Sequence, residues 1–269
     1  MKTARIMTFV LAVLLTISTE FNMPQAHGSM MRISAQNKTK GTVSVGIRTD
    51  SDKRLRIGVQ AGNSGDAYYF TYQKSEGVVD IPLMFGNDNY VISLYEEIGD
   101  KYYELRDSYD LDLQLSDYNT VYLSSSLIVP WADAPTTIAK AAELTKNKKS
   151  DFEKFHAIYK YIVENISYDP YKTVPSGYRS DPDATLAGGT GICLDFSVLQ
   201  AALLRSVGVK CRVVYGSEKD VDRLHSWNEV YFRGRWVTID PTKDAQYYAA
   251  HAPYNYAKLA KNYKVTYKF

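Results

Sequence analysis

The chain has 269 residues, with 32 lysines and arginines against 30 aspartates and glutamates and a formal net charge of +2. A nearly neutral chain has no broad electrostatic attraction to nucleic acid or to an anionic membrane surface, so neither is expected as a partner. The length suffices for one large domain or two modest ones. The two cysteines are too few for a zinc site built from two Cys-x-x-Cys pairs.

The N-terminus has the pattern of a secretory signal. Lys2 and Arg5 precede residues 6–17, which form an uninterrupted run of apolar or small side chains. This run is shorter than the roughly 18 residues that a membrane-spanning helix needs, so no transmembrane span is expected. Residues 1–26 are therefore predicted to be a signal peptide that ends near Ala26. The protein is expected to be secreted or extracellular, either released or associated with the cell surface.

Residues 30–123 show the period-two alternation of β-strands, interrupted by turns rich in Gly, Asn and Asp. Short strands at this spacing predict a β-sandwich of the immunoglobulin-like kind. Nothing in the segment has a catalytic pattern, so a spacer or recognition role is expected. The predicted strands cover residues 42–47, 55–59, 67–72, 78–81, 90–95, 102–105 and 120–123.

Residues 124–135 contain three serines and two prolines and are predicted to be a linker. After them the apolar period becomes helical over residues 138–146 and 152–163. Ser150 lies three residues before Glu153, which is the spacing of a capping box at the start of the second helix. Residues 136–269 are therefore predicted to form a second domain with mixed helices and strands.

Cys193 follows a glycine-rich turn and precedes a helical stripe of apolar residues that ends at Gly208. This pattern places Cys193 in the first turn of a buried helix. Unpaired N–H groups and the positive end of the helix dipole lower the pKa of a thiol there and can hold an oxyanion. Two other interpretations stay open: Cys193 is a small buried residue, or it pairs with Cys211 in a disulfide, as is usual in exported proteins. Because Cys211 lies within an expected strand, we interpret it as a buried spare thiol.

Residues 225–232 and 235–240 read as a hairpin with a turn at Arg233 and Gly234. If Phe232 pairs with Arg235, Asp240 lies opposite Trp227 and diagonal to His225, and the three side chains share one face. Diagonal neighbours are roughly 7–8 Å apart, within reach of a His–Asp hydrogen bond. A base held by a carboxylate is what a thiol nucleophile requires. Individually, His225 and Asp240 are also compatible with purely structural roles.

Several ordered motifs in the second domain resemble those of the transglutaminase-like superfamily of papain-type thiol enzymes. The resemblance covers about residues 138–245. Its motifs are Gly191-Ile192-Cys193, His225-Ser226-Trp227 and Thr238-Ile239-Asp240-Pro241, with further similarity in residues 165–169 and 203–216. It implies an α+β fold in which a helix bearing the cysteine packs on an antiparallel sheet bearing the histidine and aspartate.

The resemblance also implies roles for individual residues. Cys193 would be the nucleophile, His225 the general base and then acid, and Asp240 the residue that orients His225. The Cys193 N–H would contribute to an oxyanion hole, and Tyr168 is the candidate for a second donor, with simple packing as the alternative. Trp227 would shield the site or line the acyl cleft, with hairpin packing as the alternative.

The predicted function is thiol chemistry on amide bonds of a peptide or protein substrate. Water as the acceptor gives a protease or amidase, and an amine gives acyl transfer. The alternative is a non-catalytic surface adhesion or scaffold protein that binds through its β-sandwich. A third hypothesis is that the substrate is a peptide cross-bridge of a cell wall. It rests only on the predicted export and the two-part architecture.

No cofactor or metal is expected, and no Asp-x-Asp-x-Asp-Gly calcium loop occurs. Two polar segments are candidates for the rims of a cleft or for surface covering. They are residues 177–183 and the tyrosine-rich tail 247–269.

Overall fold

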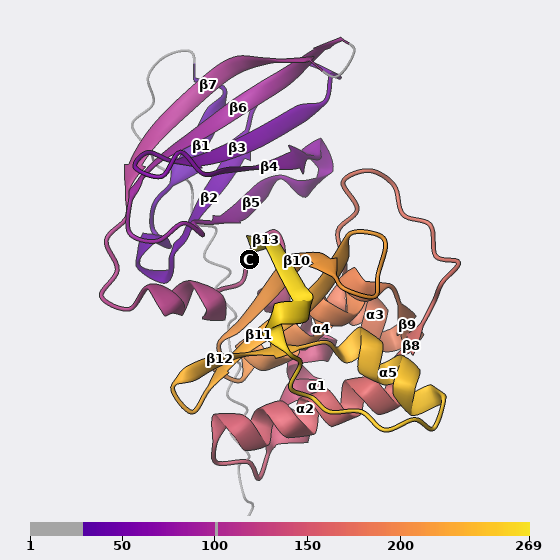
Figure 1. The fold of residues 1–269 in the computed structure, drawn as a ribbon. Helices are drawn as coiled ribbons and strands as arrows, with labels where there is room; N and C mark the ends of the chain where they lie inside the picture. Colours follow the sequence, from indigo (N-terminus) through magenta and orange to yellow (C-terminus); the bar gives the residue numbers. More distant parts are fainter. Residues whose placement is uncertain (1–28, 100–101) are drawn as a thin grey trace, which may run out of the picture.

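The computed structural model describes residues 29–99 and 102–269 (Figure 1). The predicted signal peptide, residues 1–26, lies outside the described residues. Within the described ranges, no helix has the length and apolar character to cross a bilayer.

The N-terminal half is a sandwich of two antiparallel sheets (Figure 1). One sheet has the order β1 (Met31–Ser34), β2 (Thr42–Ile47), β5 (Val78–Pro82). The other has the order β4 (Ala67–Tyr72), β3 (Leu55–Ala61), β6 (Asn89–Gly99), β7 (Tyr102–Asp112). Strands one, two and five share a sheet apart from strands three, six and seven, as in immunoglobulin-like sandwiches. The predicted sandwich is confirmed.

Two strand assignments in this half differ from the prediction. Residues 120–123 were predicted to be a strand but lie in the 3-10 helix η3 (Tyr118–Leu123). The side chain of Asp117 accepts a hydrogen bond from the Asn119 N–H and starts the helical turn, and the apolar residues are buried without a partner strand. Strand β1 was not predicted, because its four residues are too few for a clear alternation.

The C-terminal half is an α+β domain, as predicted. Its sheet has the antiparallel order β12 (Arg235–Ile239), β11 (His225–Phe232), β10 (Cys211–Glu218), β13 (Tyr263–Lys268). The helices are α1 (Pro135–Thr145), α2 (Asp151–Asn165), α3 (Pro182–Gly188), α4 (Cys193–Ser206) and α5 (Pro241–Ala249). A short parallel pair, β8 (Ser167–Tyr168) and β9 (Thr190–Gly191), precedes α4.

Helix α4 lies in the middle of this half, between the sheet and helices α1, α2 and α3 (Figure 1). Its interior residues are fully buried on every side, including Phe196, Leu199 and Leu203. A helix with apolar residues on most of its faces belongs in a core. The position of Cys193 at the start of α4 is therefore determined by the best-packed element of the domain.

The predicted capping box at the start of α2 is confirmed. The Ser150 side chain accepts from the Glu153 N–H at 3.2 Å, and the Glu153 carboxylate accepts from the Ser150 N–H at 2.9 Å. The predicted hairpin register is also confirmed, because Phe232 pairs with Arg235 and the pairing continues to Asn228 with Ile239.

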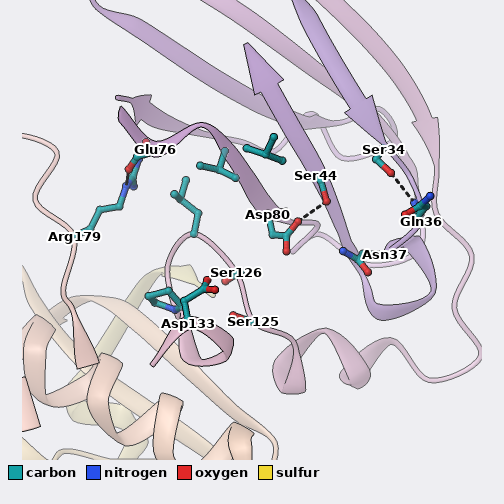
Figure 2. Close-up of a pocket in the computed structure, with 14 residues that line it drawn as sticks. Ser34, Gln36, Asn37, Ser44, Glu76, Asp80, Ser125, Ser126, Asp133 and Arg179 are labelled. Atoms are coloured by element: carbon teal, nitrogen blue, oxygen red, sulfur yellow. Dashed lines mark hydrogen bonds and ion pairs between the residues drawn. The ribbon is translucent and has the colours of Figure 1, made fainter. Parts of the chain in front are cut away.

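The two halves are packed together. Phe269 contacts Tyr68 and Phe70 of β4 and Tyr215 of β10, with ring centroids 5.5 to 5.9 Å apart. Residues 124–135, predicted to be a linker, are also packed: the Leu127 N–H donates to the Asp80 carbonyl at 2.7 Å. A polar cavity of about 540 Å³ lies between β5 and this segment (Figure 2).

Candidate active site

Cys193 is the first residue of α4 and is partly exposed. Gly189 turns the chain into β9 with a φ of 63°, a left-handed conformation that suits glycine. At Gly191 an added Cβ would lie 2.5 Å from the Asp195 Cβ, so the chain can pass the helix start only without a side chain there. The glycines of the motif thus allow the thiol to stand at the open end of a buried helix.

Both cysteines are free. Cys211 is fully buried in β10, and burial raises the pKa of its thiol to about 12. A thiol with so high a pKa is inert at neutral pH. The structure therefore contains no disulfide between Cys193 and Cys211, and Cys211 is a buried thiol as predicted.

His225 begins β11 and is 7% exposed. Its Nε2 lies 2.8 Å from the Asp240 Oδ2. Burial lowers the pKa of His225, but the hydrogen bond to Asp240 and the interaction with the nearby Cys193 thiol outweigh burial and raise that pKa to about 10. The structure thus brings His225 between the other two predicted residues.

The geometry also assigns the two ring nitrogens of His225. Because Nε2 is bound to the Asp240 carboxylate, Nδ1 is the nitrogen left for the Cys193 thiol. The carboxylate favours the tautomer with its proton on Nε2, so Nδ1 can accept the thiol proton. The arrangement can therefore generate a thiolate paired with an imidazolium.

Asp240 is fully buried and makes three contacts with its two oxygens. Oδ1 accepts from the Lys243 N–H at 3.0 Å, which caps the start of α5. Oδ2 accepts from the Tyr263 hydroxyl at 3.0 Å as well as from His225. The buried carboxylate is thus fully hydrogen-bonded, as a charge in a core must be.

Tyr263 was not identified from the sequence. It lies in β13, which pairs with β10. The ring of Tyr263 contacts the ring of Trp227, with centroids 5.0 Å apart. The alternation of residues 263–268 was a signal for this strand, but most of its side chains are exposed and the apolar face is weak. The tail predicted as a cleft rim or covering is in part an edge strand that supports Asp240.

A cleft of about 370 Å³ opens at Cys193 and His225. Tyr168 also lines it, because β8 pairs with β9 and sets Tyr168 opposite Gly191. The rest of the wall comes from Thr242 and Gln246 of α5 and from residues 220–224, a polar loop that the sequence did not assign to the site.

Two other predicted site features lie elsewhere. Trp227 is fully buried and packs between the rings of His225 and Tyr263, so it supports the site from behind and does not line the cleft. Residues 177–183 do not line the cleft either; they contact α4 and the sandwich. Within residues 29–99 and 102–269, no group of three or more His, Cys, Asp or Glu side chains is arranged to hold a metal ion.

The family model of the transglutaminase-like superfamily matches residues 138–241. The chain carries a transglutaminase-like core. The match begins in α1 and ends just after Asp240, so it includes Cys193 and His225 as well. The resemblance inferred from the motifs is confirmed at the level of the superfamily.

Two curated relatives match parts of this chain. Human kyphoscoliosis peptidase is 26% identical over 150 residues, which are 50% of this chain and 21% of that protein. The mouse protein of the same name is 28% identical over 116 residues, which are 38% of this chain and 17% of that protein. The chain spans about a fifth of the length of these relatives.

Solved structures with partial similarity include the periplasmic domain of TgpA from Pseudomonas aeruginosa. That alignment has a TM-score of 0.40 and 13% identity, and it covers 80% of this chain and 94% of the other. LapG of Legionella pneumophila aligns with a TM-score of 0.38 and 18% identity over 51% of this chain and 74% of the other.

Proposed function

We propose that this protein is a secreted thiol enzyme that acts on amide bonds of peptides or proteins through an acyl-enzyme on Cys193. The observation that carries the proposal is the placement of His225, with Nε2 on the buried Asp240 and Nδ1 available to the thiol at the start of α4. Secretion is proposed from the signal pattern of residues 1–26.

The first half of the reaction forms the acyl-enzyme. His225 Nδ1 takes the thiol proton, and the Cys193 sulfur attacks the amide carbonyl carbon. The oxyanion accepts hydrogen bonds from the Cys193 N–H, which has no intrahelical acceptor in the first turn, and from the Tyr168 hydroxyl on the cleft wall. His225 then gives its proton to the leaving nitrogen, the C–N bond breaks, and a thioester remains on Cys193.

The second half returns the enzyme to its starting state. A water or an amine gives a proton to His225 and attacks the thioester, and the Cys193 sulfur leaves and regains a proton from His225. Hydrolysis is the outcome we propose, because the cleft is bordered by an exposed loop in which Leu224 is 65% exposed and water has access to the thioester. The name of the curated relatives, a peptidase, agrees with this choice.

The decisive experiment is alkylation of the folded, reduced protein with iodoacetamide across pH, read at each cysteine by mass spectrometry. Cys193 is expected to label rapidly at neutral pH, and to lose this reactivity in His225→Ala. Cys211 is the internal control and should stay unlabelled. Slow labelling of Cys193 at a rate that is the same in His225→Ala would favour the non-catalytic scaffold function.

A second assay separates hydrolysis from acyl transfer. A mixture of fluorogenic peptides is offered with and without a primary amine, and the products are identified by mass. Free carboxylate products that persist at millimolar amine would support hydrolysis, and predominant amide products would establish acyl transfer. Failure of the labelled protein to sediment with purified cell walls would count against the hypothesis that wall peptides are the substrate.

A further inference from the structure

Asp195 lies two residues after Cys193 and is fully buried. Its Oδ2 accepts from the Ile192 N–H at 2.9 Å and from the Lys172 ammonium at 2.7 Å, and its Oδ1 accepts from the Tyr178 hydroxyl at 2.7 Å. The first of these bonds holds the backbone beside Cys193. The other two come from residues 169–181, the loop between β8 and α3, which we call the strap.

The strap continues to the sandwich. Arg179, the residue after Tyr178, forms an ion pair with Glu76 and donates to the Thr71 carbonyl of β4. Figure 2 shows Arg179 reaching from the strap to Glu76 at one end of the polar cavity. The ion pair is mostly buried, with the two side chains 21% and 17% exposed, so it is stronger than a surface pair.

The strap is also anchored at its ends. The Asp169 N–H donates to the Gly191 carbonyl at 2.9 Å, and the Asp169 carboxylate accepts from the Lys172 N–H at 3.1 Å. At the far end, the Asp181 side chain caps α3. Between these fixed ends, Arg179 is bound to the sandwich and the adjacent Tyr178 is bound to Asp195.

We propose that the sandwich sets the position of Cys193 through the strap, with Arg179, Tyr178 and Asp195 as positioning residues. This inference rests on the proposed function. The line of contacts runs from Glu76 to Arg179, from Tyr178 to Asp195, and from Asp195 to the backbone of Ile192, the residue before the nucleophile. A displacement of about 1 Å at a reacting group can lower a rate on the order of a hundredfold, so a loosened strap slows the chemistry without touching the substrate.

The test uses Arg179→Ala, which removes the ion pair between the strap and the sandwich, and Tyr178→Phe, which removes one of the two side-chain bonds from the strap to Asp195 and leaves that of Lys172. Each should lower kcat and the alkylation rate of Cys193 by at least about tenfold with KM unchanged, because neither residue lines the cleft. Hydrogen exchange at residues 192–196 should become faster in both. Glu76→Gln keeps a hydrogen-bond acceptor for Arg179, so its kcat and its alkylation rate at Cys193 should lie between those of Arg179→Ala and the wild type.

The matched control is Lys74→Ala, which removes the exposed ion pair of the same sandwich with Asp52 and should change neither rate. Unchanged exchange and alkylation in Tyr178→Phe would overturn the inference, and so would a change confined to KM. Tyr178→Phe removes one oxygen and preserves the ring, so it remains informative if Arg179→Ala does not fold. A wild-type Cys193 without His225-dependent reactivity would instead overturn the proposed function, while the exchange data would still report whether the strap holds α4.

Discussion

Asp240 performs two tasks with separate oxygens. Oδ1 caps α5 through the Lys243 N–H, and Oδ2 binds His225 and Tyr263. An asparagine can cap a helix nearly as well as an aspartate but cannot hold the same charge against an imidazolium. The two tasks can therefore be separated by one substitution.

Asp240→Asn should preserve the helix cap but lower kcat by about 10² to 10⁴, because the amide favours the wrong tautomer of His225 and carries no charge. Stability should fall only by the part that comes from the charged contact of Asp240 with His225. Asp240→Ala is the comparison, and it should lose about 1 kcal/mol more of stability with the cap. An Asp240→Asn enzyme with wild-type kcat would exclude the assigned role.

His225 gives the folded protein a pH dependence with a definite sign. Although burial opposes it, the hydrogen bond to Asp240 and the interaction with the nearby Cys193 thiol raise the pKa of His225 from 6.5 to about 10. A group whose pKa is raised by folding contributes its full stability below its unfolded pKa and loses it as the pH rises through the folded pKa.

In Cys193→Ala, where no thiol can give up a proton that offsets the one His225 holds, the free energy of unfolding should therefore fall as the pH rises above 7, with a slope from this group of at most ~1.4 kcal/mol per pH unit. Urea denaturation at pH 6, 8 and 10 measures it. With His225→Gln added, this part of the slope should vanish. An equal slope in both proteins would mean that other groups carry the dependence.

At the scale of elements, β10 is the strand through which the C-terminal tail reaches the site. Its Gly216 pairs with Val265 of β13, next to a register shift after Tyr215. A Cβ on Gly216 would collide with the Lys264 carbonyl and lie 2.8 Å from the Trp227 ring. Glycine at this position lets β13 approach closely enough to present Tyr263 to Asp240.

Gly216→Ala should push β13 from the sheet and lower the stability by about 1 to 3 kcal/mol, the range for overpacking. Activity should fall together with that of Tyr263→Phe, because both weaken the same contact to Asp240. The control is Gly188→Ala, where an added Cβ meets nothing within 4 Å. Full activity in Gly216→Ala would show that β13 can be displaced without disturbing the site.

At the scale of the whole molecule, the sandwich and the transglutaminase-like core share one apolar cluster. Phe269 joins them, because its ring contacts β4 on one side and β10 on the other. The buried Arg205 adds polar contacts, since its guanidinium donates to the carbonyls of Ser124, Cys211 and Phe269. The two halves are therefore expected to unfold together.

Phe269→Ala should lower the free energy of unfolding by about 3 to 5 kcal/mol, the range for removing a buried phenylalanine. It should also separate the unfolding transition into two, measured by calorimetry. Tyr248→Ala is the control, because it removes an exposed aromatic ring of α5 that does not join the two halves. A single transition in Phe269→Ala would indicate that other contacts suffice to couple the halves.

Much of the architecture could be predicted because it is encoded locally. The capping box of α2, the glycine turn before Cys193 and the turn of the hairpin each involve residues close in sequence. The hairpin register alone brings His225 and Asp240 to one face, so two members of the site follow from a two-residue turn. Strand 120–123 was wrongly predicted because its apolar residues are buried in a helical turn and not in a sheet.

The sequence by itself determined the sandwich, the helix that begins at Cys193 and the pairing of His225 with Asp240, since short-range periodicity and turn chemistry suffice for each. Only the tertiary structure decided that Tyr263 supports Asp240, that residues 220–224 line the cleft, and that the strap ties Asp195 to the sandwich. These contacts join segments far apart in the chain. Their energy comes from burial and from pairing with partners that no local pattern identifies.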